Sequence, residues 1–427
     1  MKSLKIMAAC MLAAASLASA FADAYIKVTG STAFRKAFYF ACVNSINNPK
    51  IACIGGQTDG SDMSGANRAV ITGIGKTGTA YAGTNVTIQY GFAGSIGGLT
   101  ALVTPSKTIP LSGFDANHTW MSASNASNVS GANSGTGKIT GYINFTSESD
   151  VAFDGPAFPT VAMSDSFLTS TPVTGTLTAD EDNPVTGVGV VGFNWVKGQN
   201  GVGSSAAAGY SRFTNISTLQ ANLLLSAGEL PLSFFTGNSA DTAIDVIFIG
   251  RNNDSGTRLD TEAEADYGFG FSSESQYQPT YSSTPGYLIN GVTYIGDVGY
   301  SDGGKVARDL AFAQVSGAVD DAGKPFILVS YLGKGDSSTV KAVNADCILS
   351  FNGVKYDHAD DMIRFGTYSG WSYEHCLYTA TDTASLKNKS LINDITARMT
   401  STDAVQSGVV SGTMHVSRSI EGGVISP

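Results

Sequence analysis

The sequence predicts an α/β protein made of two lobes, and three observations lead to this prediction. Its 427 residues are enough for two lobes with sizeable cores. Short apolar runs alternate with helical patterns, an order that is typical of mostly parallel sheets flanked by helices. A strongly apolar, β-rich stretch at 187–196 lies near the middle of the chain. We expect this stretch to cross from one lobe to the other.

Strands and helices are expected in alternation after residue 24. Apolar, β-rich runs that end at small polar residues predict the strands, and apolar residues at helical spacing predict the helices. In chain order the expected elements are a strand at 25–28, a helix at 33–46, a strand at 86–92, a helix from Leu99, strands at 160–163 and 187–196, a helix at 216–230, a strand at 244–249, a helix from Leu259, further alternation through 292–295, 306–315 and 325–332, then a strand after Asp346, an aromatic segment at 368–378 and a helix near 391–399.

Two polar stretches interrupt this alternation. Residues 50–80 are rich in Gly and Thr, and we expect them to be irregular. Residues 105–150 are dominated by Ser, Asn, Gly and Thr, which indicates an exposed insertion with a β-ribbon.

The N-terminus predicts the compartment. Lys2 and Lys5 precede an apolar run at 6–17, and small residues follow it, so residues 1–24 read as a secretory signal peptide cleaved between about Ala20 and Ala24. We therefore expect a periplasmic or extracellular protein. Losing two Lys and one Asp with this segment takes the formal charge from −10 to −11. This acidity argues against nucleic acid as a partner.

Four cysteines follow the signal peptide. In an oxidising compartment an even number predicts two disulfides, and three pairings are open. The pairing Cys42–Cys53 with Cys347–Cys376 is preferred because each bond closes a local loop. No Cys-x-x-Cys spacing of a redox or zinc site is present.

One local design occurs three times, in which a strand delivers a small polar loop to the start of a helix. The three loops are Thr29-Gly30-Ser31-Thr32, Gly94-Ser95-Ile96-Gly97-Gly98 and Asp254-Ser255-Gly256-Thr257. Each offers hydroxyls and backbone N–H groups at the positive end of a helix dipole. In open α/β sheets such loops meet at the edge where ligands bind. Together with Arg251, whose guanidinium suits oxyanions, they predict a small-oxyanion site.

A fourth strand ends in Ser164-Asp165. A carboxylate repels a fully ionised anion, but it can accept a hydrogen bond from the P–OH group of hydrogen phosphate. Sulfate has no such proton at neutral pH, so Asp165 predicts discrimination against sulfate.

These residues, in this order, resemble the motifs of the phosphate-binding periplasmic proteins of ABC uptake systems. The resemblance covers most of 25–330 in outline. It implies a two-lobed periplasmic binding protein (type II) fold, in which each lobe is a mixed sheet flanked by helices and carries polar β-rich insertions. Lobe 1 is expected at 25–192 plus 335–427, and lobe 2 at 193–334. The implied ligand contacts are Ser31, Thr32, Ser95, Asp165, Arg251, Ser255, Gly256 and Thr257.

The resemblance also implies a function. We expect a monomeric, non-enzymatic protein that binds phosphate or a related oxyanion in the cleft without metal or cofactor, and that serves an ABC permease of the inner membrane. Two residues depart from the family motif, because Asn253 and Asp254 stand where Asp and Gly are expected. The exact oxyanion is therefore left open.

Parts of the sequence also fit other functions. Ala93-Gly94-Ser95-Ile96-Gly97 is close to a nucleophile elbow, so a serine hydrolase using Ser95 is one alternative. A secreted surface or structural protein on the same scaffold is another. The stretch Asp357-His358-Ala359-Asp360-Asp361 could hold a metal, but a solvated acidic loop fits it better.

Overall fold

The computed structural model describes residues 23–54, 66–103, 120–126, 143–145, 147–154, 158–173, 179–181, 187–199, 207–268, 272–282, 287–379 and 385–427. Residues 1–22 of the expected signal peptide and most of the 105–150 insertion lie outside these ranges. Every helix in the described ranges is too short or too polar to span a membrane.

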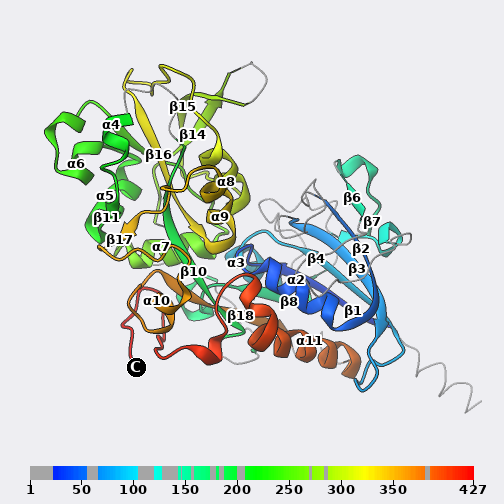
Figure 1. Cartoon of the computed structure of the whole chain (residues 1–427). Helices are drawn as coiled ribbons and strands as arrows, with labels where there is room; N and C mark the ends of the chain where they lie inside the picture. The colour runs from blue at the N-terminus through cyan, green and yellow to red at the C-terminus, as the bar shows by residue number, and fades with distance from the viewer. Residues whose placement is uncertain are drawn as a thin grey trace, which may run out of the picture.

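A single mixed sheet runs through both halves of the described chain (Figure 1). Its strands in spatial order are β12 (Glu229–Pro231), β13 (Asp245–Phe248), β16 (Phe326–Gly333), β10 (Gly189–Lys197), β18 (Trp371–Thr379), β8 (Val161–Ser164), β1 (Ala24–Gly30), β4 (Asn85–Gly91), β3 (Arg68–Gly75), β2 (Ile46–Ile54) and β6 (Ile143–Phe145), with β9 (Ala179–Glu181) beside β18. Three short pairs lie outside it, namely β5 (Trp120–Met121) with β7 (Phe153–Asp154), β11 (Asn215–Ile216) with β17 (Ser350–Phe351), and β14 (Gln276–Tyr281) with β15 (Ile289–Gly296).

Helices flank this sheet in each lobe. In the first lobe they are α2 (Arg35–Asn44), α3 (Ser95–Val103) and α11 (Leu386–Arg398). In the second lobe they are α4 (Ala207–Tyr210), α5 (Thr218–Ala227), α6 (Leu232–Thr236), α7 (Gly256–Glu264), α8 (Gly303–Ala311), α9 (Lys334–Val343) and α10 (Asp360–Arg364). Figure 1 shows the two lobes side by side, with α2 and α11 over one and α8 and α9 over the other. The predicted two-lobed α/β class is confirmed.

Strand β10 joins the lobes. Its first half, Gly189–Gly192, pairs with β18 in lobe 1, and its second half, from Phe193, pairs with β16 in lobe 2. The return crossing lies at the start of β18, near Trp371, and not at 335 as predicted. Residues 334–370 stay with lobe 2 because α9 packs on α8 and β16, and β17 pairs with β11. Below, lobe 1 means 24–192 with 371–408, and lobe 2 means 193–370.

The element predictions hold along most of the chain, with two corrections. The sheet is mixed, as the family resemblance implied, and not mostly parallel, as the alternation of strands and helices predicted, because β3, β10 and β18 run antiparallel to their neighbours. The stretch at 50–80, expected to be irregular, contains strand residues at 50–54 and 68–75, where β2 and β3 form an antiparallel pair, while 55–65 lie outside the described residues. Small apolar side chains on both faces of this pair are buried, for example Cys53 on one face and Ala52 on the other. Their Thr and Gly neighbours conceal the strand pattern in the sequence.

The four cysteines lie in described residues and are buried thiols, so neither predicted disulfide is present. Cys347 is part of the core of lobe 2, whereas Cys376 is part of the core of lobe 1, which makes that pairing impossible. Cys42 and Cys53 pack in the lobe 1 core from α2 and β2. All four fill the cores as small side chains, and the Cys53 thiol also donates to the Asn144 side chain at 3.5 Å.

Glycines allow α3 to lie directly on β1. A Cβ at Gly98 would be 2.8 Å from the backbone nitrogen of Gly30 and closer still to its Cα. Gly94, which precedes the helix, has a positive φ of 105°. This close approach places the first turn of α3 beside the loop that follows β1.

We predict that Gly98→Ala destabilises the protein by about 1–3 kcal/mol, because the added methyl meets backbone atoms that cannot rotate away. Thermal or urea unfolding of the mature chain measures this change. Gly412→Ala is the matched control, since a Cβ there meets open space. Equal stability of the two variants would contradict the close packing of α3 on β1.

Candidate functional site

The carboxyl ends of β1, β4 and β8 meet at one edge of the sheet, where the predicted polar loops come together. These strands are parallel neighbours, so their ends point the same way. The backbone N–H of Ser31 donates to the carbonyl of Met163 at 2.8 Å, and that of Gly94 donates to the carbonyl of Gly30 at 2.9 Å. The loop after β13 approaches the same edge from lobe 2. The structure thus brings Ser31, Ser95 and Asp165 together with the loop at 252–257.

Asp165 is the centre of this junction and is 1% exposed. Its carboxylate accepts hydrogen bonds from the hydroxyl of Ser95 in lobe 1 and from that of Thr257 in lobe 2, the latter at 3.0 Å. Burial raises the pKa of Asp165, and the two hydroxyls and the charge of Arg251 oppose that rise. One carboxylate therefore links donors from both lobes.

The loop at 252–257 fills the space in front of α3. The carbonyl of Asp254 accepts from the backbone N–H groups of Ile96 at 2.9 Å and Gly97 at 3.4 Å. A Cβ at Gly256 would lie 2.7 Å from the Ser95 hydroxyl and closer still to the Asp165 carboxylate. Protein oxygens therefore occupy the start of α3 in this closed arrangement.

Ser255 and Arg251 lie at the two ends of this loop. The Ser255 hydroxyl caps α7 by accepting from the backbone N–H of Arg258 at 3.2 Å. The Arg251 guanidinium donates to the carbonyls of Tyr300 at 3.2 Å and Ser301 at 3.1 Å, just before α8. Arg251 is 3% exposed, so its buried guanidinium stabilises the wall of the site through these two hydrogen bonds.

Sequence reasoning missed a cluster of buried carboxyl groups behind this junction. Asp260, Glu374 and Glu421 are each at most 2% exposed. Asp260 accepts from the hydroxyls of Ser166 at 3.1 Å and Ser372 at 2.9 Å. Burial, followed by the charge of Asp165, raises the pKa of both Asp260 and Glu374 well above the usual range. Raised pKa values favour the uncharged acids.

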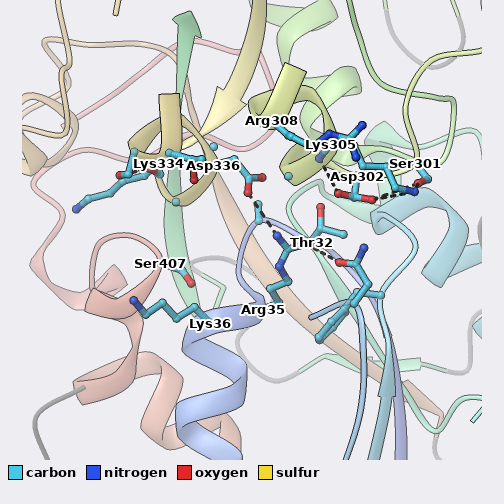
Figure 2. A pocket seen from close by; sticks show the side chains of 18 of the residues that line it. Thr32, Arg35, Lys36, Ser301, Asp302, Lys305, Arg308, Lys334, Asp336 and Ser407 are labelled. Atoms are coloured by element: carbon cyan, nitrogen blue, oxygen red, sulfur yellow. Dashed lines mark hydrogen bonds and ion pairs between the residues drawn. The ribbon is translucent and has the colours of Figure 1, made fainter. Parts of the chain in front are cut away.

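A cleft of about 900 Å³ opens between the lobes beside this junction (Figure 2). Six basic and two acidic side chains line it, in a chain whose formal net charge is −10. Its charged lining is Arg35, Lys36 and Arg68 from lobe 1, and Asp302, Lys305, Arg308, Lys334 and Asp336 from lobe 2. Of the eight predicted ligand residues only Thr32 lines the cleft, while the others lie behind or beside it.

An ion pair bridges the cleft. The Arg35 guanidinium, at the start of α2 in lobe 1, donates to the Asp336 carboxylate at the start of α9 in lobe 2 at 3.4 Å, and to the Asn67 side chain at 2.5 Å. Figure 2 shows Arg35 and Asp336 pointing toward each other. Burial raises the pKa of Asp336, and the charge of Arg35 opposes that rise.

The start of α9 in lobe 2 has a sequence pattern that was not recognised as part of a site. Strand β16 ends at Gly333, and Lys334-Gly335-Asp336 opens α9, which is a further strand–loop–helix junction. In the described structure no side chain caps the first turn of α9, whereas in α2 the backbone N–H of Ala37 donates to the Ser407 hydroxyl at 3.0 Å. The backbone N–H groups at the start of α9 therefore add partial positive charge to the cleft.

The acidic loop at 357–361 holds its carboxylates in ion pairs. Asp357 pairs with Lys341 at 2.6 Å, Asp360 with Lys334 at 2.7 Å and Asp361 with Arg364 at 2.8 Å. Among the described residues, no group of His, Cys, Asp and Glu has the arrangement of a metal site. These pairs account for the loop without a metal.

Known proteins offer similarity in structure alone. No family model and no curated protein matches the sequence. Among solved structures, an ABC-type phosphate transport receptor from Vibrio cholerae is 13% identical, with a TM-score of 0.40 over 90% of this chain and 99% of that one. A possible phosphate binding protein from Planctomyces limnophilus is 12% identical, with a TM-score of 0.37 over 91% and 95%. At this identity the ligands of those proteins are not transferred to this chain.

The buried carboxyl cluster predicts a pH-dependent stability. A carboxyl whose pKa is raised by folding adds stability below its unfolded pKa, and this stability is lost as the pH rises through the folded value. We expect the free energy of unfolding of the wild type to increase from pH 8 to pH 5. Glu374→Gln should reduce this increase by about 1.4 kcal/mol for each unit of pKa shift that it removes.

Thermal unfolding across this pH range measures the effect. Asp361→Asn is the matched control, because that side chain is 74% exposed. Parallel pH profiles for the wild type and Glu374→Gln would show that Glu374 ionises as readily in the folded chain as in the unfolded one.

Proposed function

We propose that this chain is an extracytoplasmic protein that binds phosphate or a related tetrahedral oxyanion between its lobes, as the substrate-binding component of an ABC uptake system. The observation that carries the proposal is the basic cleft between the lobes of an acidic chain, with Asp165 and its hydroxyl donors directly behind it. A site of this kind needs local donors and not a positive net charge.

Entry of the anion requires the lobes to separate at the two crossings, in β10 and before β18. Separation breaks the hydrogen bond between Thr257 and Asp165 and withdraws the Asp254 carbonyl from α3. The N–H groups of Ile96 and Gly97 and the two hydroxyls then become available to an oxyanion. Closure around the ligand is a hinge motion of a kind common to two-lobed binding proteins.

The eight predicted residues supply the contacts in this proposal. Ser31, Thr32 and Ser95 donate from lobe 1, and Ser255, Gly256 and Thr257 donate from lobe 2. Arg251 adds charge from the wall. Asp165 accepts the proton of hydrogen phosphate, whereas fully ionised sulfate leaves it facing another anion.

The alternative functions have less support. The Ser95 hydroxyl is fully buried and donates to Asp165, so it does not present a nucleophile to a substrate. The ring of His358 lies elsewhere, where its Nε2 contacts the hydroxyl of Ser337 at 2.8 Å. A purely structural surface protein gives no reason for basic side chains to gather in the cleft.

Calorimetric titration with phosphate, arsenate and sulfate tests this function. We expect phosphate and arsenate to bind, and sulfate to bind about 10- to 100-fold more weakly, since a hydrogen bond to a charged group is worth about 1.5–3 kcal/mol. Asp165→Asn should narrow this difference because the amide can donate to sulfate.

Asp361→Asn serves again as control and should keep the selectivity of the wild type. Equal, weak heats for phosphate and sulfate in the wild type would contradict the role given to Asp165. No heat with any of the three anions would contradict oxyanion binding itself.

A further inference from the structure

The cleft is larger than a single oxyanion requires. Its volume of about 900 Å³ lies in the range of pockets that hold whole organic ligands, roughly 300–1,000 Å³. One water molecule takes up about 30 Å³ in the liquid, and phosphate has only five heavy atoms. A lone phosphate would leave most of this cleft to solvent.

Positive charge lines both walls of the cleft. On the lobe 1 wall, Arg35, Lys36 and Arg68 lie around the start of α2. On the lobe 2 wall, Lys305 and Arg308 project from α8, and their side chains are 53% and 56% exposed. Two groups of basic side chains therefore face each other, one on each lobe.

Carboxylates offset part of this charge. Asp336 pairs with Arg35, Asp302 with Lys305 at 3.4 Å, Asp309 with Arg308 at 3.0 Å and Asp360 with Lys334 at 2.7 Å. The pairs of Lys305 and Arg308 are half exposed and therefore weak. Among the described residues, the six basic groups that line the cleft stand against these four acidic ones, and the start of α9, which no side chain caps there, adds about half a positive charge.

The start of α9 is built for close approach by an anion. Gly335 has no side chain, and a Cβ there would meet nothing within 4 Å, so its backbone is open to the cleft. Asp336 follows it and points at Arg35 across the cleft. An anionic group from a ligand can replace the Asp336 carboxylate as the partner of Arg35.

We propose that this cleft binds a compound carrying two or more phosphate groups, with one group on the lobe 1 wall at Arg35 and Arg68 and another on the lobe 2 wall at Lys305 and the start of α9. This inference deepens the proposed function, on which it rests, by naming the size and charge of the ligand. Asp336 is the internal competitor that holds Arg35 when the cleft is empty of ligand.

Titration of the mature chain with three probes tests the inference. Inorganic tripolyphosphate and inositol hexakisphosphate represent the inorganic and organic sources, and inorganic phosphate is the reference. We expect the better of the two polyphosphates to bind at least about tenfold more tightly than phosphate, a difference of about 1.4 kcal/mol. Raised salt should weaken this binding.

Two variants with opposite expected effects on polyphosphate affinity test where the ligand binds. Lys305→Glu should weaken polyphosphate binding about tenfold, and Asp336→Asn should strengthen it several-fold because it releases Arg35. A gain in affinity is not a result that misfolding produces. Lys355→Glu is the matched control, since it makes the same charge change on an exposed lobe 2 residue outside the cleft, and it should alter affinity less than twofold.

The outcomes separate the two proposals. Polyphosphates that bind no more tightly than phosphate, or whose binding ignores both cleft variants, would overturn this inference and leave phosphate binding intact. Polyphosphate binding that follows the cleft variants, with no phosphate binding, would overturn the proposed function and support the cleft. Absence of binding by all three probes would overturn both.

Discussion

The carboxylate of Asp165 is the point at which the two lobes meet, and the arrangement of the site depends on it. It accepts the hydroxyl of Ser95 from one lobe and that of Thr257 from the other. The backbone around this carboxylate is constrained at two glycines. Gly256 must lack a side chain to pass the carboxylate, and Gly94 must adopt a positive φ to bring α3 to the edge of the sheet. A buried carboxylate that is fully hydrogen-bonded is a specific connection, because loss of either donor leaves an unsatisfied polar group.

This junction also explains how an acidic interior can adjoin a cleft for anions. Asp260, Glu374 and Glu421 all lie behind the cleft, and burial raises the pKa of each of them. The uncharged forms are thereby favoured, so these groups oppose a nearby anion less than exposed carboxylates would. In front of them, Arg35, Lys305 and Arg251 together outweigh the cost of burial and hold the pKa of Asp302 below its usual value. Positive charge is thus concentrated in the cleft, in front of carboxyl groups whose raised pKa values disfavour ionisation.

The sequence predicted the strands and the polar loops well, because each depends on a local pattern. The loops after β1, β4 and β8 converge, as expected for the ends of neighbouring strands, and the loop after β13 meets them from the other lobe. What it could not predict depends on contacts between distant segments. The basic cleft joins Arg35 to Asp336 across 301 positions, and the return crossing near Trp371 follows from which lobe α9 packs against. Gly333-Lys334-Gly335 was visible as a strand–loop–helix signal, but only the fold shows that it faces α2.

The junction at Asp165 also shows the effect of Asn253 and Asp254, the two residues that depart from the family motif. The family pattern has a glycine where Asp254 stands, and here the backbone carbonyl of Asp254 accepts the first N–H groups of α3. A helix start that a protein carbonyl already satisfies has less to offer a small anion in the closed state. The start of α9 has no such cap from a side chain in the described structure, and it lines the cleft. The positive helix end that a ligand can approach therefore lies outside the predicted pocket, in a cleft whose volume suits a larger anion.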